Sequence, residues 1–155
     1  MWHGATMLRR RHLPLLLFAA ALLAACEDDT ARPYLEYAGG GFIFNYRSAN
    51  HYYGLVVRQK KPLPEGGSLE LRFEVPGGTD IQREPVSPGR LQYKFQTGDL
   101  EGIEAGRPYK VTVLLRDAAG REIERLEKSF ATTVDQSKLP AKPLGTGPGY
   151  EPAEP

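Results

Sequence analysis

Few side chains of this chain could carry out chemistry, and their number limits what that chemistry could be. Cys26 is the only cysteine, and His51 is the only histidine beyond residue 12. These two residues cannot supply the four nitrogen or sulfur ligands of a structural zinc site or the three protein ligands usual in a catalytic one. Ser68 follows two glycines, but it lacks the final glycine of a nucleophile elbow and leads into a predicted strand. We therefore expect no catalytic set, no metal site and no cofactor.

Two further motifs could bind ions. The carboxylates of Asp99, Glu101 and Glu104 could hold calcium, but the chain has no Asp-x-Asp-x-Asp-Gly loop, so a solvated acidic loop is favoured. Gly39-Gly40-Gly41 precedes a strand rather than the helix start that phosphate-binding glycine loops use, so it predicts a flexible turn. His51 lies in a predicted loop beside tyrosines, where a solvated or packed histidine is favoured over a catalytic base.

The first 25 residues have the layout of an export signal. Arg9, Arg10 and Arg11 precede an apolar run of 13 residues, Leu13 to Ala25, which ends in small residues. The run is shorter than the roughly 20 residues that a membrane-spanning helix needs. A buried core helix is the alternative, but Pro14 and the acidic residues that follow Cys26 favour a leader that is removed.

The leader ends in Leu23-Ala24-Ala25-Cys26, which resembles the lipobox of bacterial lipoproteins. The resemblance implies that the chain is cut between Ala25 and Cys26, and that Cys26 is acylated and becomes the first mature residue. Lipoproteins of this type usually carry several acyl chains, and two or more chains anchor a protein stably where one does not. The implied partner is membrane lipid, and the implied location is the bacterial cell envelope, with the domain facing the periplasm.

Three features of the leader and of the residue after Cys26 leave alternatives open. Met7 could be the true start. Arg10-Arg11-His12-Leu13 loosely resembles a twin-arginine signal, although the apolar run favours the general secretory route. Glu27, which follows the lipidated cysteine, leaves the choice between the inner and the outer membrane open.

Composition bounds the part of the chain that follows the leader. Residues 26–155 hold 17 of the 20 Lys and Arg residues and all 19 Asp and Glu residues, so their net charge is near −2. Nucleic-acid binding, which needs a basic surface, is disfavoured. We divide the chain into a signal peptide at 1–25, a lipidated tether at 26–33, one domain at 34–134 and a Pro/Gly-rich tail at 135–155. The tail is predicted to be extended or disordered, or alternatively pinned to the domain by Leu139 and Leu144.

Within the domain the dominant period is two, which predicts antiparallel strands with one wet face. Apolar and polar residues alternate at 42–46, 53–57, 69–75, 91–95 and 109–115, and more weakly at 81–86, where Pro85 suits an edge strand. A turn at 117–120 predicts a hairpin that returns as a strand over 121–133, with a helix over 121–128 as the alternative. The fold class is therefore all-β, an antiparallel sandwich of about seven strands or a small barrel, and residues 41–47 could be a strand added ahead of it.

The segment from Leu100 to Val113 resembles the loop and strand of fibronectin type III and related immunoglobulin-like domains. In this segment Gly106 precedes Tyr109, which opens a Tyr-x-Val-x-Val strand. The resemblance implies an immunoglobulin-like β-sandwich in which Tyr109 is the tyrosine corner, with its hydroxyl bonded to backbone upstream.

Aromatic residues are concentrated ahead of the first turn, with seven in the 20 residues from 34 to 53. Tyr52 and Tyr53 are adjacent and must face opposite ways in a strand, so at least one tyrosine is expected at the surface. A tyrosine-rich rim around a core is favoured, and a binding patch is the alternative. The candidate patch consists of Tyr34, Tyr37, Tyr46, Tyr52 and Tyr53. A basic stretch, Arg58 to Lys61, could contact anionic headgroups or an acidic partner, although a solvated loop is favoured.

These features together predict a membrane-anchored envelope lipoprotein whose immunoglobulin-like domain acts by binding. Its partner is expected to be another envelope protein. The alternatives are a carbohydrate or peptidoglycan binder that uses the tyrosines as stacking platforms, and a hydrolase with an unrecognised site.

Overall fold

The computed structural model describes residues 32–146 and 151–152. The chain divides into two compact units, residues 1–32 and 33–155, and the second unit holds the fold described below. The predicted signal peptide, its predicted cleavage site and Cys26 lie outside the described residues. The strands of the second unit are β1 (Leu35–Asn45), β2 (Asn50–Gln59), β3 (Ser68–Val75), β4 (Gly78–Pro85), β5 (Gln92–Gln96), β6 (Tyr109–Arg116), β7 (Glu122–Phe130), β8 (Gly145–Thr146) and β9 (Glu151–Pro152).

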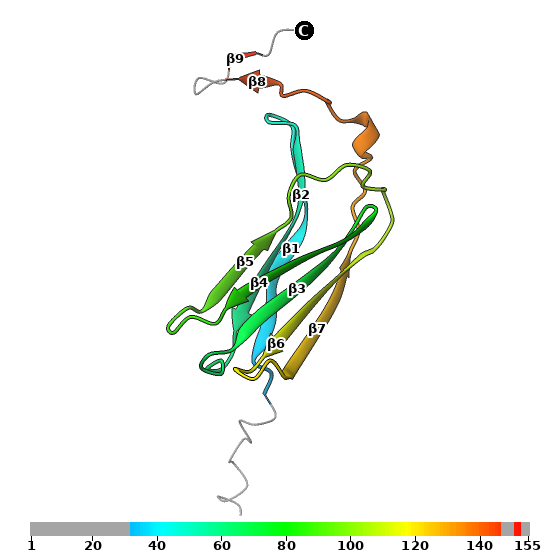
Figure 1. Ribbon diagram of the computed structural model, residues 1–155. Helices are drawn as coiled ribbons and strands as arrows, with labels where there is room; N and C mark the ends of the chain where they lie inside the picture. The colour runs from blue at the N-terminus through cyan, green and yellow to red at the C-terminus, as the bar shows by residue number, and fades with distance from the viewer. Residues whose placement is uncertain (1–31, 147–150, 153–155) are drawn as a thin grey trace, which may run out of the picture. The chain divides into compact units, whose positions relative to one another are not determined.

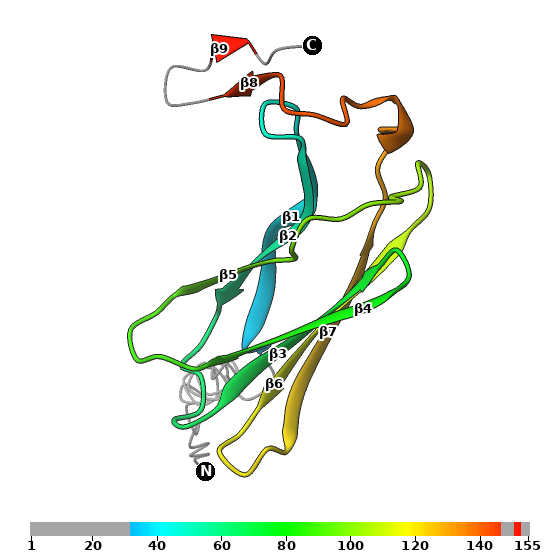
Figure 2. The ribbon, with the colours of Figure 1, turned by 45° about the horizontal axis from the view of Figure 1, so that its top comes forward.

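Seven of these strands form two antiparallel sheets that pack face to face (Figure 1). One sheet has the order β1-β2-β5 and the other β4-β3-β6-β7, so the chain crosses between sheets after β2, β4 and β5. Figure 2 shows the two sheets from a second direction. Crossing connections of this kind are those of immunoglobulin-like sandwiches. The prediction of an all-β sandwich of about seven strands is confirmed.

The predicted strands agree with the observed ones in the middle of the domain and differ near its start. Strands β3, β5 and β6 begin and end within one residue of the predicted bounds. Strand β4 is an edge strand, as its last residue, Pro85, suggested, because a residue without a backbone N–H is tolerated at a sheet edge. Strand β1 begins at Leu35, so the glycines at 39–41 lie inside a strand and the prediction of a flexible turn is wrong. His51 lies in β2, so the prediction of a loop there is also wrong.

The core is built around the aromatic ring of Tyr53, which is fully buried. The ring stacks on Phe42 with a centroid distance of 4.6 Å, and it contacts Phe73 and Phe130 edge-on at 5.0 and 5.8 Å. Edge-on and offset contacts of this kind suit the ring quadrupole. The Tyr53 hydroxyl donates to the carbonyl of Tyr109 on the opposite sheet (3.2 Å), so its polar end is satisfied inside the core.

Glycine is required in β1 because β2 and the side chain of Phe130 pack closely against the strand. A Cβ atom on Gly40 would lie 2.7 Å from Cδ1 of Leu55 and 3.2 Å from Cζ of Phe130. Gly41 has a φ of +144°, which side-chain-bearing residues rarely adopt. A bulge between Tyr37 and Gly39 shifts the register of β1 on β2 just before this point. The glycine run therefore lets the two sheets approach each other at this edge.

Polar contacts hold the two open sides of the sandwich. On one side, the Glu124 carboxylate on β7 accepts the backbone N–H groups of Tyr34 (2.6 Å) and Leu35 (3.0 Å). On the other side, the Gln82 amide on β4 donates to the carbonyl of Gln96 on β5 (2.7 Å). Each contact joins an edge strand of one sheet to the edge of the other.

The last hairpin forms as predicted, with β7 as the returning strand rather than a helix. Asp117 organises its turn, because its carboxylate accepts the N–H groups of Ala119 and Arg121 at 2.9 Å. Gly120 closes the turn with a φ of +79°. In the described part of the chain, no helix is long and apolar enough to cross a membrane.

The segment after β7 packs on the domain, so the prediction that residues 135–155 are extended or disordered is wrong for its described first half. A short 3-10 helix, η3 (Gln136–Lys138), is capped by Asp135, whose carboxylate accepts the N–H of Ser137 (3.1 Å). The N–H of Leu144 donates to the carbonyl of Tyr46 (3.4 Å). The contact at Leu144 is made by backbone, since 58% of the residue is exposed.

Candidate functional site

The loops at one end of the sandwich form a concave surface. The β1–β2 turn, the long β5–β6 loop and the segment around η3 meet there, at the end opposite the start of β1 and therefore opposite Pro33 (Figures 1 and 2). The open cleft between them has a volume of about 670 Å³. It is lined by Ala49 and His51, by residues 99–105 and by six residues between 135 and 141. We call it the loop cleft.

The first part of the β5–β6 loop is fixed along β2. The Thr97 hydroxyl accepts the N–H of Tyr53 (3.0 Å), while the N–H of Thr97 donates to the carbonyl of the same tyrosine (2.9 Å). Two residues further, the Asp99 carboxylate accepts the N–H of His51 (2.6 Å), and the N–H of Leu100 donates to the His51 carbonyl (2.7 Å). The loop therefore extends the β2–β5 ladder and gives the cleft a rigid wall.

The second part of the loop is held by two side chains from other elements. The Gln136 amide of η3 bridges the loop, since its oxygen accepts the N–H of Ile103 (2.8 Å) and its nitrogen donates to the carbonyl of Leu100 (2.7 Å). The Tyr109 hydroxyl accepts the N–H of Glu104 (3.0 Å). This is the upstream backbone bond that the resemblance to immunoglobulin-like domains implied for Tyr109. Sequence analysis missed Gln136, and the cap at Asp135 was the one local signal that the tail had structure here.

The loop cleft combines carboxylates with apolar side chains. Asp99, Glu101, Glu104 and Asp135 line it, and the lining includes no lysine or arginine. Two of the four carboxylates are paired at its border, Glu104 with Arg107 (2.9 Å) and Asp135 with Lys138 (3.5 Å). The Ser137 hydroxyl, which donates to Asp135 (2.6 Å), is the largest cause that lowers the pKa of that carboxyl. The acidic loop predicted from the sequence is thus one wall of a cleft.

The apolar part of the lining comes from both walls. Leu100 and Ile103 belong to the β5–β6 loop, and Leu139 and Pro140 follow η3. A cleft with acidic and apolar sides suits a ligand that carries a positive charge on an apolar stem, as lysine and arginine side chains do.

His51 contributes its ring to the same region, but its surroundings do not match those of a catalytic base. The residue is 7% exposed, and its Nδ1 atom is buried without a hydrogen-bond partner in the described structure. The nearby Asp99 carboxylate binds the backbone of His51 rather than its ring. The Ser137 hydroxyl in the cleft donates to Asp135 and not to the imidazole. The described residues thus place a histidine, a serine and carboxylates together without the nucleophile–base–carboxylate contacts of a triad.

The three carboxylates considered for calcium, at 99, 101 and 104, all line the loop cleft. They do not converge, because the described part of the chain contains no group of three or more His, Cys, Asp or Glu side chains that could hold a metal ion.

The five tyrosines of the candidate patch do not form one surface. Tyr53 is fully buried in the core, so its inclusion in a binding patch is wrong. Tyr37 faces the core, where burial first and Glu127 second raise its pKa to about 12. Tyr34 packs against the core near the first residue of β1, and Tyr46 lies in the β1–β2 turn with 45% of its surface exposed.

Tyr52 is the member of the set that lies on the outer face of a sheet. It stands opposite Ile43 in the β1–β2 ladder and borders a shallow hollow of about 440 Å³. Gly39, Gly41 and Gly54 also line this hollow. The alternation of β2 explains the separation of Tyr52 from Tyr53, because successive side chains point to opposite faces.

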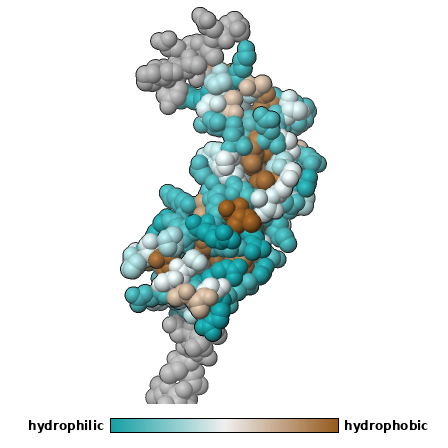
Figure 3. All heavy atoms as spheres, viewed as in Figure 1, coloured by the Kyte–Doolittle hydropathy of each residue, from teal (hydrophilic) through white to brown (hydrophobic). Residues whose placement is uncertain are grey.

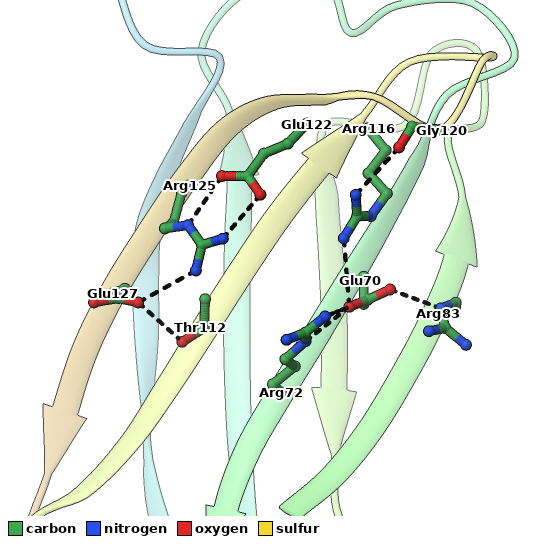
Figure 4. Close-up of polar contacts among 9 residues, drawn as sticks. All are labelled: Glu70, Arg72, Arg83, Thr112, Arg116, Gly120, Glu122, Arg125 and Glu127. Atoms are coloured by element: carbon green, nitrogen blue, oxygen red, sulfur yellow. Dashed lines mark hydrogen bonds and ion pairs between the residues drawn. The ribbon is translucent and has the colours of Figure 1, made fainter.

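A third candidate surface is the charged outer face of the four-stranded sheet (Figure 4). The Glu70 side chain is nearly inaccessible there and pairs with Arg72 (2.6 Å), Arg83 (2.8 Å) and Arg116 (3.7 Å). The hydrogen bond from Arg83, followed by that from Arg72, lowers the pKa of Glu70. Leu114, opposite Glu70 in the ladder, is fully buried beside this network. The arginines are engaged with carboxylates of their own sheet, which indicates a structural role for this face.

No known protein-family model matches the chain, and no curated protein sequence is similar to it. What supports a function is therefore the leader, the fold and the geometry of the loop cleft.

Proposed function

We propose that the protein is a lipid-anchored lipoprotein of the bacterial envelope, and that its sandwich binds a positively charged segment of another envelope protein in the loop cleft. The role is that of a non-catalytic binding or accessory subunit. The observation that carries the proposal is the position of the cleft at the end of the domain opposite Pro33, the residue at which the tether reaches the fold.

The position of the cleft agrees with the expected position of the anchor, at the opposite end of the sandwich. A tether that leads from Cys26 to Pro33 brings the membrane to the Pro33 end of the sandwich. The loop cleft lies at the other end, away from the point of attachment, and is open to a partner. Rigid strands that position binding loops at one end are a recurrent use of sandwich folds.

The lining of the cleft supports the choice of partner chemistry. Its four carboxylates outnumber the two cations paired at its border, so the cleft attracts a further cation, and its apolar side chains can pack against the stem of a lysine or arginine. Because the β5–β6 loop is fixed by Thr97, Asp99 and Gln136, little conformational entropy is lost when a partner binds.

The anchor is tested by metabolic labelling of the full chain with a radioactive fatty acid. The expected result is label in the wild type and none in Cys26→Ser, with a matching shift in the intact mass. Equal labelling of the two chains, or none in either, would contradict lipidation at Cys26.

The binding role is tested by photo-crosslinking in the host bacterium. A photoreactive residue at Ala105, which lines the cleft, is expected to capture an envelope protein, and one at Thr79 on β4 is not. Glu101→Lys should abolish the crosslink, whereas Glu65→Lys, on the β2–β3 loop at the Pro33 end, should leave it unchanged. Equal capture from Ala105 and Thr79 would contradict the role of the cleft.

The hollow around Tyr52 favours a second candidate function, the binding of a glycan of the cell wall. An aromatic ring beside a glycine floor can serve as a stacking platform for a sugar ring. Retention of the full chain on isolated peptidoglycan should then fall in Tyr52→Ala and persist in Tyr46→Ala. Equal retention of the two variants would remove Tyr52 as the platform.

A further inference from the structure

The corner of the sandwich beside Pro33 combines an exposed leucine with basic side chains. Leu91 is 65% exposed, the largest exposure among the large apolar residues described. Its carbonyl accepts the N–H of Gln59 (2.9 Å), and the N–H of Lys60 donates to the carbonyl of Tyr34 (2.8 Å). These two bonds place Leu91, the end of β2 and the entry of the chain into the domain next to one another. We call this region the basic corner and define it by Arg58, Lys60, Lys61, Arg90 and Leu91.

The charge of the basic corner is positive. Arg58 and Lys60 share one carboxylate, that of Glu36, at 3.4 and 3.1 Å. Arg90 pairs with Glu84, and Lys61 lies over the ring of Tyr34 with Nζ 4.0 Å from the centroid. Three cations, those of Arg58, Lys60 and Arg90, are thus set against two carboxylates, and the side chains of Arg58 and Lys60 are each about half exposed.

The face seen in Figure 3 is largely hydrophilic, and its apolar areas are small and separate from one another. The exposed Ile81 on β4 neighbours the arginine–glutamate network of the four-stranded sheet, where the cations are engaged with Glu70.

Covalent geometry keeps the basic corner close to the bilayer if Cys26 is acylated. The seven residue-to-residue steps from Cys26 to Pro33 can span at most about 25 Å, at roughly 3.5 Å per step. The attraction between basic side chains and anionic lipid acts within a Debye length of about 8–10 Å. A surface held so near the membrane meets lipid headgroups at a high effective concentration.

We propose that the basic corner is a second membrane contact, in which its basic side chains bind anionic lipid headgroups and Leu91 inserts among them. This inference rests on the proposed lipid anchor and adds to it. The contact fixes the orientation of the sandwich, so that the loop cleft points away from the bilayer. An acyl anchor alone allows the domain to tumble on its tether.

Tryptophan fluorescence of the full lipidated chain in vesicles tests this contact. Trp2 is the only tryptophan and lies in the leader, so Leu91→Trp gives the processed protein a single reporter. Ile81→Trp, on the other sheet, is the matched control. In vesicles of brominated anionic lipid, the reporter at 91 should be blue-shifted and quenched several-fold more strongly than the control at 81. In vesicles of brominated neutral lipid the two should be quenched alike.

Charge reversals and added salt distinguish binding by the basic corner from a general attraction between the protein and the vesicle. Lys60→Glu in the Leu91→Trp background should remove the extra quenching, and so should salt on the order of 1 M, where the Debye length is about 3 Å. Lys142→Glu, in the segment after η3, should leave it unchanged. Equal quenching at 91 and 81 in anionic vesicles, or the same extra quenching at 91 in anionic and in neutral vesicles, would overturn the inference.

Flotation of the same samples distinguishes this inference from the anchor. A chain that fails to float with neutral vesicles overturns the lipid anchor and the inference together. A chain that floats while its reporter at 91 stays unquenched overturns the basic corner alone.

Discussion

Substitution of Gly40 by alanine tests how the glycine run of β1 contributes to the fold. The added Cβ would lie 2.7 Å from Cδ1 of Leu55, 2.9 Å from the carbonyl oxygen of Gly54 and 3.2 Å from Cζ of Phe130. Contacts below 3.0 Å require a neighbour to move. One of the two closest atoms belongs to the β2 backbone, which the ladders on both sides hold in place. Gly40→Ala should therefore strain the β1–β2 pair and displace Phe130.

The magnitude follows from the balance of two effects. Overpacking of a tight site costs about 1–3 kcal/mol of unfolding free energy. An alanine that fits without strain instead stabilises by about 0.4–1 kcal/mol, since the unfolded chain loses freedom. Gly39 is the matched control, because a Cβ there would meet nothing within 4 Å. We expect the two variants to differ by about 1.4–4 kcal/mol, with Gly40→Ala the less stable.

Urea unfolding of the two variants and the wild type is the appropriate assay, since it gives the free energy of unfolding directly. In a thermal melt, Gly40→Ala should lower the midpoint by roughly 4–12 °C, at about 4 °C per kcal/mol for a domain of this size. If Gly40→Ala is as stable as Gly39→Ala, the strand accommodates the added Cβ without cost. Close packing around position 40, including that of Phe130, then does not require a glycine there. A large loss in Gly39→Ala would equally contradict the reasoning.

Further predictions concern the loop cleft and the titratable groups. Tyr109→Phe and Gln136→Ala should each cost about 1–2 kcal/mol, because they leave partly buried loop N–H groups unpaired, and should speed hydrogen exchange at 103–104. The arginines around Glu70 lower its pKa, so this stabilisation is present above the ordinary glutamate value and is lost as the pH falls below it. Acid unfolding of Glu70→Gln should accordingly depend less on pH than that of the wild type. Burial raises the pKa of Tyr37 to about 12, so stability should fall as the pH rises from about 10 through 12, and less so in Tyr37→Phe. Phenolate absorbance and far-UV circular dichroism, followed together, measure this alkaline transition.

The class of the fold could be predicted because strand periodicity is local. Alternation over Leu69–Val75 places every second residue on the core face, and the structure buries Leu69, Leu71 and Phe73 there. The turn residues Asp117 and Gly120 likewise act within four positions of each other, so the last hairpin was predictable. The prediction failed at Gly39–Gly41, because glycine occurs both in flexible turns and in strands that pack closely against other segments. A glycine run is typical of a flexible turn, and only the close packing of β2 and of Phe130, 90 residues further along the chain, requires it inside a strand.

The candidate site depended on contacts between distant segments, which the sequence pattern does not contain. Asp99 was recognised as part of an acidic loop, but its bond to the backbone of His51 joins residues 48 positions apart. Gln136 was assigned to a tail, and its two bonds to the β5–β6 loop span 33 and 36 positions. Aspartate and glutamine are both common in loops. The roles of these two residues follow from hydrogen bonds to segments that are distant in the sequence.

The sequence by itself determined the all-β class and the strand that begins at Tyr109, and it predicts an export leader with a lipobox at Cys26, since each depends on neighbouring residues. The tertiary structure alone decided which tyrosines are buried, where the glycines of β1 are needed, and that the segment after β7 completes a cleft. It also brought Leu91 beside the end of β2 and the entry of the chain. The physical reason is that side-chain alternation and turn chemistry act over a few residues, whereas burial and surface charge depend on segments that only folding brings together.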